Sequence, residues 1–442
     1  MRLASTLSLL PAVCLALVAS AAGEAPKTPP FRYVWAKAYY VLPETHNHES
    51  GYKSLCEGLN GKIYIGTAKY GVNGYLVEFD PATEKQRIAV DAAAVTGATG
   101  TGHAAQAKIH TRNHVGPSGT IYIGSKQGYP SRAERDAVDI PPYPGGYVIA
   151  YDPKTNTSRS LGMPWPGFGV IDVVSDEPRG LIYATMCEDP YAWMAADLNT
   201  ARWRWLGPEL VVNGQTLVDH RGRANAITWD FKLARYDPAA NKLTTQPITL
   251  DGEKLTRTRA DTRMLALWNL ATDGRTAYVT ILDRAQLFRI DLGGDDKGAV
   301  PMTTLGTLVE GPNPDSRCCL TIAPDGRVYA VVSVQNDTGY GTGRRLHHLG
   351  RYDPATNRCE DLGVLAVKNP DFFNFAPGPD GKKPANSHGY HTLPDGTLTP
   401  LHNTMALTAA HDGTLYATVL YPFTLLRIDP AALQETREAE KK

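Results

Sequence analysis

The sequence predicts an all-β fold, a seven-bladed β-propeller, and three recurring features carry that prediction. A glycine turn precedes an apolar strand that contains tyrosine, as in NGKIYIG and SGTIYIG. A second strand ends in an Asp-Pro turn, as in YLVEFDPATE and YVIAYDPKTN. A further short strand flanks each pair on either side. Four short antiparallel strands in each of about seven copies are typical of propeller blades.

The copies follow one another at spacings of roughly 45 to 85 residues, which favours one repeat fold over two separate domains. They begin at Asn60, Ser118, Arg179, Arg221, Asp273, Asp325 and Asp412. Tyrosines recur at one strand position, where we expect them to pack inside the fold: Tyr64, Tyr122, Tyr183, Tyr278, Tyr329 and Tyr416. The predicted propeller covers residues 31–435, and a charged tail covers 436–442.

The last copy stops after its third strand, at Asp429, whereas the N-terminal stretch FRYVWAKAYYVL belongs to no copy. We therefore expect Phe31 to Leu42 to supply the missing outer strand of the last copy. Such a pairing closes the ring and leaves no open sheet edge.

The first residues are typical of a secretory signal peptide. Arg2 precedes a short apolar run from Leu7 to Val18, and the small residues Ala19, Ser20 and Ala21 follow it. We expect residues 1–21 to be removed and the protein to be secreted or periplasmic. No later segment is long and apolar enough to span a membrane. The 45 Lys and Arg balance the 45 Asp and Glu, so the net charge gives no reason to expect nucleic acid as a partner.

Five cysteines follow the predicted signal, and their odd number and irregular spacing form no disulfide framework. We expect buried free thiols, and a single bridge through Cys56 or Cys359 stays open. The five are Cys56, Cys187, Cys318, Cys319 and Cys359.

The functional residues are expected on one face of the ring. In a propeller the first-to-second and third-to-fourth strand turns share a face, and here these turns are short. The long and varied connections lie on the other face, which suits a binding site. The stretch Ala107 to Pro130 delivers several reactive groups to that edge: Lys108, His110, Arg112, Asn113, Lys126, Gln127 and Tyr129.

Arginine, histidine or asparagine recurs where the innermost strands begin. The residues are His110 or Arg112, then Arg263, Arg317, and His402 or Asn403. Their convergence at a central channel suits an anionic ligand, because arginine binds a carboxylate through two parallel hydrogen bonds. The alternative is that these arginines form structural ion pairs with Asp172, Asp261 or Asp315.

Histidine spacing leaves metal binding open. His46 and His48 lie two residues apart in THNHES, and His110 and His114 lie four apart in KIHTRNH. Neither is a structural zinc spacing. The sequence requires no cofactor, although a divalent metal assembled near the central channel is compatible with it. Glycine fingerprints for phosphates or dinucleotides and the GxSxG elbow are missing from the sequence.

Three stretches resemble a carbohydrate-active β-propeller family that removes terminal L-rhamnose from glucuronic acid in arabinogalactan side chains. They are THNHESGYKSLCEGLNGKIYIGTAKYG, AQAKIHTRNHVGPSGTIYIGSKQGYPS and YPGGYVIAYDP, and the resemblance covers about Thr45 to Asp176. Members of that family are L-rhamnose-α-1,4-D-glucuronate lyases or L-rhamnosidases, and ulvan-lyase-like propellers are similar in fold.

The resemblance implies roles for particular residues. In ulvan-lyase-like propellers the segment similar to KIHTR carries a catalytic histidine, which corresponds to His110. Their second histidine corresponds to Lys126, a departure from the pattern. In the rhamnosidase-like members one histidine near the start of the first blade is implicated, and His48 or His46 is its counterpart.

The chemistry of uronate elimination agrees with these residue types. It needs a cation to neutralise the carboxylate, a base to remove H5 and a donor to the departing oxygen. Arg112, Arg263 or Arg317 would neutralise, His110 or Lys126 would accept the proton, and Tyr129 would donate one. Further substrate contacts are expected from His46, His391 and His402.

A glycosidase would instead use two facing carboxylates, and the sequence offers only the scattered Asp172, Glu188 and Asp189. We therefore predict an exported lyase that acts on an acidic oligosaccharide or polysaccharide. Two alternatives stay open: a hydrolytic α-L-rhamnosidase acting on the same linkage, and a non-enzymatic propeller that binds a glycan or a protein.

Overall fold

The computed structural model describes residues 28–47, 49–128, 142–188, 190–255, 266–317, 319–402 and 404–433. The predicted signal peptide and the predicted tail lie outside the described residues. So do several residues singled out in the sequence: His48, Tyr129, Asp189, Asp261, Arg263, Cys318 and Asn403.

The regular secondary structure of the described chain is almost entirely β-strand, arranged in five sheets. The helical segments of these residues are short: α1 (Ala92–Thr96), η1 (Pro43–Thr45), η2 (Glu177–Arg179), η3 (Pro370–Phe372) and η4 (Pro430–Leu433). Asp91 caps α1 by accepting a hydrogen bond from the Ala94 amide, and Gly97 ends it in the left-handed conformation. Within the described ranges, no helix is long and apolar enough to cross a membrane.

The first nine-stranded sheet holds the residues of greatest functional interest. Its strands are β2 (Glu49–Glu57), β3 (Ile63–Ala68), β4 (Tyr75–Asp80), β5 (Lys85–Asp91), β6 (Lys108–Ile109), β7 (His114–Val115), β8 (Ile121–Lys126), β9 (Val148–Asp152) and β10 (Thr157–Ser160). They form two antiparallel runs, β2 to β5 and β7 to β10. Strand β6 joins the runs, because Lys108 pairs with both Ala68 and Lys126.

The next two sheets repeat this organisation. The four-stranded sheet contains β11 (Val170–Asp176), β12 (Leu181–Met186), β13 (Trp193–Asp197) and β14 (Trp203–Trp205). The second nine-stranded sheet contains β15 (Leu217–Val218), β16 (Ala224–Ile227), β17 (Lys232–Asp237), β18 (Lys242–Leu250), β19 (Glu253–Lys254), β20 (Ala266–Leu270), β21 (Thr276–Ile281), β22 (Gln286–Asp291) and β23 (Val300–Thr307). A parallel pair, β18 with β23, joins its two halves.

The last sheets carry the C-terminal third and the N-terminal strand. The eight-stranded sheet contains β1 (Tyr33–Tyr40), β24 (Leu320–Ile322), β25 (Val328–Gln335), β26 (Arg345–Asp353), β27 (Arg358–Val367), β30 (Thr404–Ala409), β31 (Leu415–Val419) and β32 (Thr424–Ile428). The two-stranded sheet contains β28 (Tyr390–Thr392) and β29 (Leu398–Pro400).

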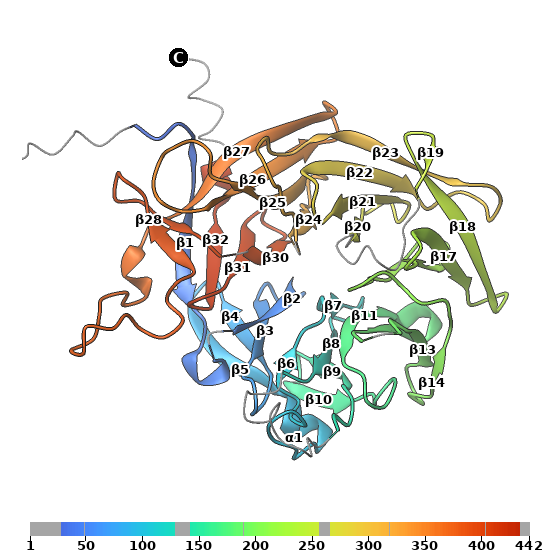
Figure 1. The fold of residues 1–442 in the computed structure, drawn as a ribbon. Helices are drawn as coiled ribbons and strands as arrows, with labels where there is room; N and C mark the ends of the chain where they lie inside the picture. Colours follow the sequence, from blue (N-terminus) through green and yellow to red (C-terminus); the bar gives the residue numbers. More distant parts are fainter. Residues whose placement is uncertain are drawn as a thin grey trace, which may run out of the picture.

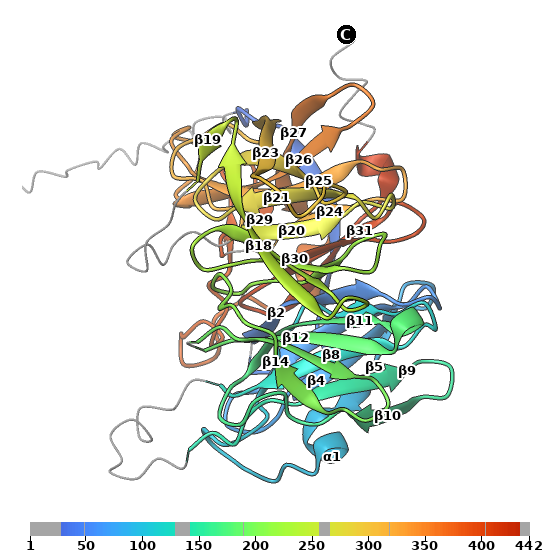
Figure 2. The same cartoon turned by 90° about the vertical axis from the view of Figure 1, so that its right-hand side faces the viewer.

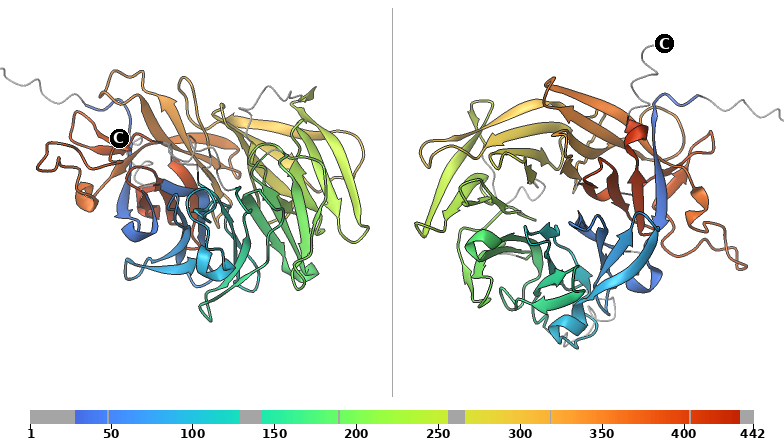
Figure 3. Two further views of the ribbon diagram at one scale, coloured as in Figure 1. Left: turned by 60° about the horizontal axis from the view of Figure 1, so that its bottom comes forward. Right: turned by 180° about the vertical axis from the view of Figure 1, so that it is seen from behind.

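The sheets follow one another around a common centre (Figure 1), with α1 at the outer edge (Figure 2). Strand β1 pairs antiparallel with β32 over Lys37–Tyr40 and parallel with β27 over Tyr33–Ala36. From behind, the blue strand β1 runs alongside the red C-terminal strands (Figure 3). The N-terminal strand therefore pairs with the strand predicted for it. The hydrogen-bonded sheets are five rather than seven among the described residues, so the count of seven blades stays a prediction.

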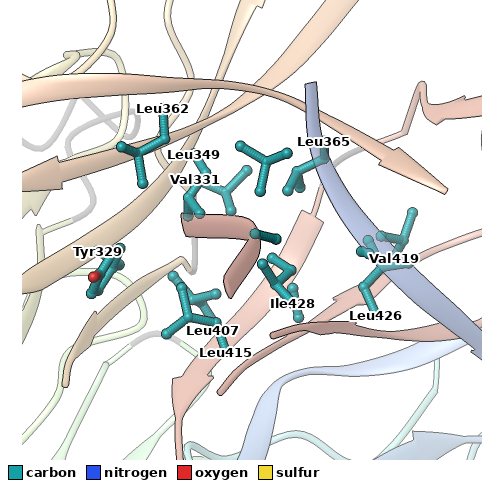
Figure 4. Packing of buried hydrophobic residues seen from close by; sticks show 14 of the residues in the cluster. Tyr329, Val331, Leu349, Leu362, Leu365, Leu407, Leu415, Val419, Leu426 and Ile428 are labelled. Carbon is teal, nitrogen blue, oxygen red and sulfur yellow. The ribbon is translucent and has the colours of Figure 1, made fainter. Parts of the chain in front are cut away.

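Apolar side chains fill the layers between neighbouring runs of strands. Figure 4 shows one such layer inside the eight-stranded sheet, where Val331 and Leu349 from β25 and β26 meet Leu415, Leu426 and Ile428 from β31 and β32. Most inner strands bury alternate or continuous apolar residues against the next run, which is how a propeller forms its core. The six recurring tyrosines are all buried, as predicted. Within the described ranges the cysteines are free thiols: Cys56, Cys187, Cys319 and Cys359.

Candidate functional site

A bulge in β2 places the first residues of the site. The register between β2 and β3 shifts between Ser50 and Leu55, and Tyr52 adopts a φ of 53°. The Tyr52 amide donates to the Ser50 hydroxyl oxygen at 3.0 Å. Gly51 lies so close to β6 that an added Cβ would be 2.1 Å from the Ile109 carbonyl oxygen. This close approach requires glycine and brings Tyr52 against the residues of β6.

Lys108 on β6 is buried against two phenol rings. Its Nζ lies 3.7 Å from the Tyr52 ring centroid and donates to the Tyr70 hydroxyl at 2.8 Å. A cation over an aromatic face is attracted by the ring quadrupole, most strongly where water is excluded. The ammonium group and the Tyr52 ring therefore hold each other in place.

His110 follows β6, and its ring meets the Tyr52 ring edge to face at a centroid distance of 4.7 Å. Its Nδ1 is buried and has no hydrogen-bond partner among the described residues. Burial, followed by the charges of Lys108, Lys126 and Lys53, lowers the His110 pKa well below its ordinary value. The imidazole is therefore neutral at neutral pH and able to accept a proton.

Lys126 is the last residue of β8 and pairs with Lys108 across the two strands. Its Nζ lies 2.8 Å from the Cys187 sulfur and 3.2 Å from Glu188 Oε1. Burial alone would lower the Lys126 pKa, but the Cys187 sulfur and the Glu188 carboxylate raise it above its ordinary value. Lys126 is therefore an ammonium ion at neutral pH. Glu188 is itself anchored, since its Oε2 accepts the Gly169 amide at 2.6 Å and its Oε1 accepts Gln127 Nε2 at 3.0 Å.

Lys53 completes what we call the basic cluster: Tyr52, Lys53, Lys108, His110 and Lys126. The Lys53 side chain is buried, and its Nζ donates to the Asn213 carbonyl oxygen at 2.8 Å. Lys53 also lines a cavity of about 180 Å³ with residues of β20, β24 and β30. Lys53 is therefore the member of the cluster that connects it to the cavity among the innermost strands.

Arg112 lies on the wall of the same cavity but is bound on several sides. Its guanidinium contacts Asp172 Oδ1 at 3.4 Å and donates to the Thr216 carbonyl oxygen at 2.8 Å. It also donates to the Trp268 carbonyl oxygen and Asn269 Oδ1, both at 3.2 Å. These partners come from the four-stranded sheet and from the second nine-stranded sheet with the segment that leads into it, and we call the arrangement the Arg112 crossing. It matches the ion pair with Asp172 that the sequence left open as the alternative to substrate binding.

Arg317 is likewise paired, since its Nη2 lies 3.0 Å from Asp315 Oδ2. His46 is buried between Tyr40 and Phe423, and its Nε2 lies 2.9 Å from the Val41 carbonyl oxygen. The Arg317–Asp315 pair also corresponds to the alternative reading of the rim arginines. For both residues the predicted contact with substrate stays a prediction.

His391 lies on β28, away from the basic cluster in the sequence and in the sheets. Both of its ring nitrogens are buried without a hydrogen-bond partner in the described part of the chain. Gly343 packs on the ring so closely that an added Cβ would be 2.1 Å from it. Burial lowers the His391 pKa, so the ring is neutral at neutral pH.

His402 belongs to a second group, which we call the aromatic cluster: Glu49, His388, His402 and Tyr421. The His388 and Tyr421 rings stack at 4.6 Å, and the His402 ring stands perpendicular to Tyr421 at 5.0 Å. The Tyr421 hydroxyl donates to Glu49 Oε1. Glu49 and Tyr52 are close neighbours on β2, so the two clusters adjoin.

Three of these residues were missed by reasoning from the sequence: Glu49, Tyr52 and Lys53. A signal for the bulge exists, because Gly51 and the polar Lys53 interrupt an otherwise apolar strand in GYKSLCE. A glycine inside a strand often marks a bulge or a close backbone approach. Reading β2 as a regular strand hid the two side chains that the bulge presents.

The described residues hold no group of three or more His, Cys, Asp or Glu side chains that could bind a metal ion. His48, Asp189 and Asp261 lie outside that search. The divalent metal that the sequence left open therefore stays untested.

No protein-family model and no curated protein sequence matches the chain. The resemblance to a rhamnose-releasing family therefore stays a prediction from the sequence. Solved structures do match. A streptogramin B lyase structure superposes with a TM-score of 0.52 at 10% identity, covering 89% of this chain and 97% of that chain.

A fungal alcohol oxidase of the AA5 family, in complex with copper, matches with a TM-score of 0.51 at 11% identity, covering 92% of this chain and 77% of that chain. The β-propeller domain of Cps50 (Swd1) from Myceliophteria thermophila has a TM-score of 0.49 at 13% identity, covering 85% of this chain and 96% of that chain. At such identities the likeness shows the fold alone, and the chain has a β-propeller fold. Propellers serve enzymes and binding proteins alike.

Proposed function

We propose that this protein is an exported polysaccharide lyase that releases terminal L-rhamnose from glucuronic acid in an arabinogalactan-type glycan by β-elimination. The observation that carries the proposal is the His110 imidazole, neutral and edge-on to the Tyr52 phenol, among the ammonium groups of Lys53, Lys108 and Lys126. A base, a hydroxyl donor and an anion-binding group of cations are the three requirements of uronate elimination.

The lysines act on the uronate carboxylate. Neutralising that carboxylate makes H5 more acidic, because the negative charge that develops on C5 can be delocalised into the carboxyl group. Lys126 is held as an ammonium ion by Glu188 and Cys187, so it binds the anion and does not remove the proton. Of the two bases that the sequence offered, His110 is the one we select.

His110 removes H5, the electron pair forms the C4–C5 double bond, and the bond from C4 to the leaving oxygen breaks. Tyr52 donates its phenolic proton to that oxygen. The Lys108 ammonium, 3.7 Å from the Tyr52 ring centroid, stabilises the negative charge left on the phenolate. The proton on His110 then returns to Tyr52, which restores both groups for the next turnover.

The substrate itself strengthens the base. In the free protein burial lowers the His110 pKa, and the three lysine charges lower it further. A carboxylate bound among these lysines offsets their charge, so the His110 pKa rises when the uronate is in place. The proton is therefore removed most readily when the correct anion is bound.

Carboxylates near the basic cluster fit hydrolysis less well. Asp172 is bound to Arg112 and to the Thr216 amide, the latter at 2.8 Å. Glu188 is bound to Lys126, Gln127 and the Gly169 amide. A glycosidase needs one carboxylic acid and one facing carboxylate at the scissile bond. Asp172 and Glu188 are both occupied by structural partners, so Glu49 of the adjoining aromatic cluster, whose Oε2 has no partner in the described part of the chain, would lack a second free carboxylate opposite it.

The test uses purified protein with gum arabic, recording free rhamnose together with the ultraviolet absorbance of the new C4–C5 double bond. Rhamnose with rising absorbance supports the lyase. Rhamnose without absorbance means hydrolysis and contradicts the proposed chemistry. If neither signal appears, ulvan and other uronate polymers are tested next. If none of these polymers is cleaved, the lyase proposal is rejected in favour of a non-enzymatic binding protein.

We also propose that the ring has seven blades. The four-stranded runs are β2 to β5, β7 to β10, β11 to β14, β15 to β18, β20 to β23, β24 to β27, and β30 to β32 with β1. Strand β6 and the pairs β18–β23 and β1–β27 would then be links that merge neighbouring blades into larger sheets. An experimental density map would count the blades directly.

A further inference from the structure

The aromatic cluster presents an apolar ring surface next to the basic cluster. His388 is exposed and stacks on Tyr421 with an interplanar angle of 28°, and His402 stands at 86° to Tyr421. An open ring face beside a perpendicular wall accommodates the C–H face of a sugar, since aromatic side chains supply apolar area together with polar edges.

Gly389 holds this surface in shape. Its amide donates to the Tyr421 carbonyl oxygen at 2.6 Å, and its own carbonyl oxygen accepts the His402 amide at 3.2 Å. A Cβ on residue 389 would lie 1.9 Å from the Leu420 carbonyl oxygen. Glycine is therefore required for the close approach that sets His388 against Tyr421 and places His402 beside them.

The aromatic cluster contains polar atoms that can form hydrogen bonds with the hydroxyl groups of a ligand. Glu49 Oε1 accepts the Tyr421 hydroxyl, whereas Glu49 Oε2 is buried and has no partner among the residues that the structure describes. The same holds for Nδ1 of His402. A buried carboxylate oxygen without a partner is costly, and a ligand hydroxyl would remove that cost.

The charges of the two clusters are opposite in sign. Glu49 repels an anion, whereas the three lysines attract one. Burial raises the Tyr421 pKa, and the Glu49 carboxylate and then Tyr52 raise it further. Tyr52 belongs to the basic cluster, so the two clusters interact electrostatically. A ligand that bridges β2 would therefore place a neutral, hydroxyl-bearing group on the aromatic cluster and a carboxylate on the basic cluster.

We propose that Glu49, His388, His402 and Tyr421 form a binding subsite for a neutral sugar, in which Glu49 and His402 bind its hydroxyls and the His388–Tyr421 stack covers one face. This subsite fixes the direction of the chain, with the uronate on the lysines. The assignment of direction rests on the proposed function, whereas binding of a neutral sugar is independent of it.

The experiment measures binding of three neutral monosaccharides, L-rhamnose, D-galactose and L-arabinose, to the full chain by saturation-transfer NMR and titration. D-Glucuronate is the anionic probe. In Glu49→Gln we expect the affinity for the neutral sugar to fall roughly tenfold, because a charge-assisted hydrogen bond is lost. Glucuronate affinity should hold or increase. Lys108→Met should show the reverse pattern.

A second variant distinguishes loss of a specific contact from loss of the folded structure. Tyr421→Phe keeps the ring stack and removes only the hydroxyl bonded to Glu49, and thermal melting checks that each variant is folded. His411→Gln serves as a matched control, because His411 is exposed and pairs with Glu57 outside both clusters.

The subsite is wrong if none of the three neutral sugars binds, or if folded Glu49→Gln binds them as well as the wild type does. It is also wrong if Glu49→Gln weakens glucuronate and the neutral sugar equally. The lyase can fail separately: neutral sugar binding that depends on Glu49, without rhamnose release from gum arabic, supports the subsite and rejects the lyase.

Discussion

Two groups of cations separated by a few residues in the chain are used in different ways. The Arg112 crossing matches its charge with the buried Asp172 and adds three oxygen acceptors from the second nine-stranded sheet and the segment that leads into it. The basic cluster places ammonium groups around His110, and burial together with the charges of these groups lowers the pKa of the imidazole. This contrast indicates that the partners around a cation, rather than its presence in a motif, distinguish a structural arginine from a lysine that can bind a ligand.

The largest effect is expected from His110→Gln. Glutamine keeps a polar side chain but cannot accept H5, and a positioned general base contributes roughly 10²–10⁴-fold to a rate. We expect turnover on gum arabic to fall about 10³-fold with glucuronate binding retained. Steady-state rates and titration measure the two effects, with His411→Gln as the control. A His110→Gln enzyme with near wild-type turnover would remove the basic cluster from catalysis.

Arg112→Met tests the other half of the comparison. It leaves the carboxylate of Asp172 buried without its guanidinium, and breaking such a pair costs about 3 kcal/mol of folding free energy. Urea denaturation measures this loss, and the double variant Arg112→Met with Asp172→Asn should recover part of it. If Arg112→Met is as stable as the wild type but no longer binds glucuronate, Arg112 belongs to the binding site. The distinction between the Arg112 crossing and the basic cluster would then be wrong.

Tyr52→Phe is expected to have an intermediate effect. The ring that packs on Lys108 and His110 is kept, and only the hydroxyl that would protonate the leaving oxygen is lost. We expect turnover to fall by roughly 10²-fold, with an unchanged melting temperature. A substrate with an activated leaving group, such as a nitrophenyl glycoside of the uronate, should lose less. An equal loss on both substrates would speak against Tyr52 as the donor.

Lys126→Met should have the smallest effect on rate, about tenfold, because two lysines remain to bind the carboxylate. It also changes the pH dependence. Removing one positive charge raises the His110 pKa, so the base becomes protonated at a higher pH. The acid limb of the profile of kcat/KM should therefore move to higher pH in Lys126→Met. A limb that stays in place would mean that the field of Lys126 does not reach the base.

The fold was accessible from the sequence because its signals are local. Repeated strands with Gly turns, Asp-Pro turns and buried tyrosines each lie within a few residues, and the N-terminal strand was recognised because the last copy lacked one. The role of His110 came instead from the resemblance of KIHTR to the ulvan-lyase-like propellers, and it stays a prediction. Local periodicity thus predicted the β-propeller fold but not the chemistry of the candidate site.

The other parts of the candidate site depend on contacts between residues that are distant in the sequence. Glu49 meets Tyr421 across 372 residues, and Arg112 meets Asp172 across 60. The bulge that presents Tyr52 depends on the fit of Gly51 against Ile109 in β6. Nothing in the composition of β2 separates this arrangement from a regular strand, because the tertiary contact, rather than strand propensity, selects the bulge.

The pairing of β1 also determines when the protein can finish folding. Ala38 and Asn369, which bond to each other beside this strand, are 331 residues apart. Such non-local contacts form late, because a long loop must close before they stabilise the fold. During synthesis β1 would therefore wait with unpaired edges until β27 and β32 are made, and on refolding the edges of β27 and β32 stay open to strands of other molecules until β1 docks. We expect the yield of refolded monomer to fall as protein concentration rises, with the sheet edges that β1 covers as the place where aggregation begins.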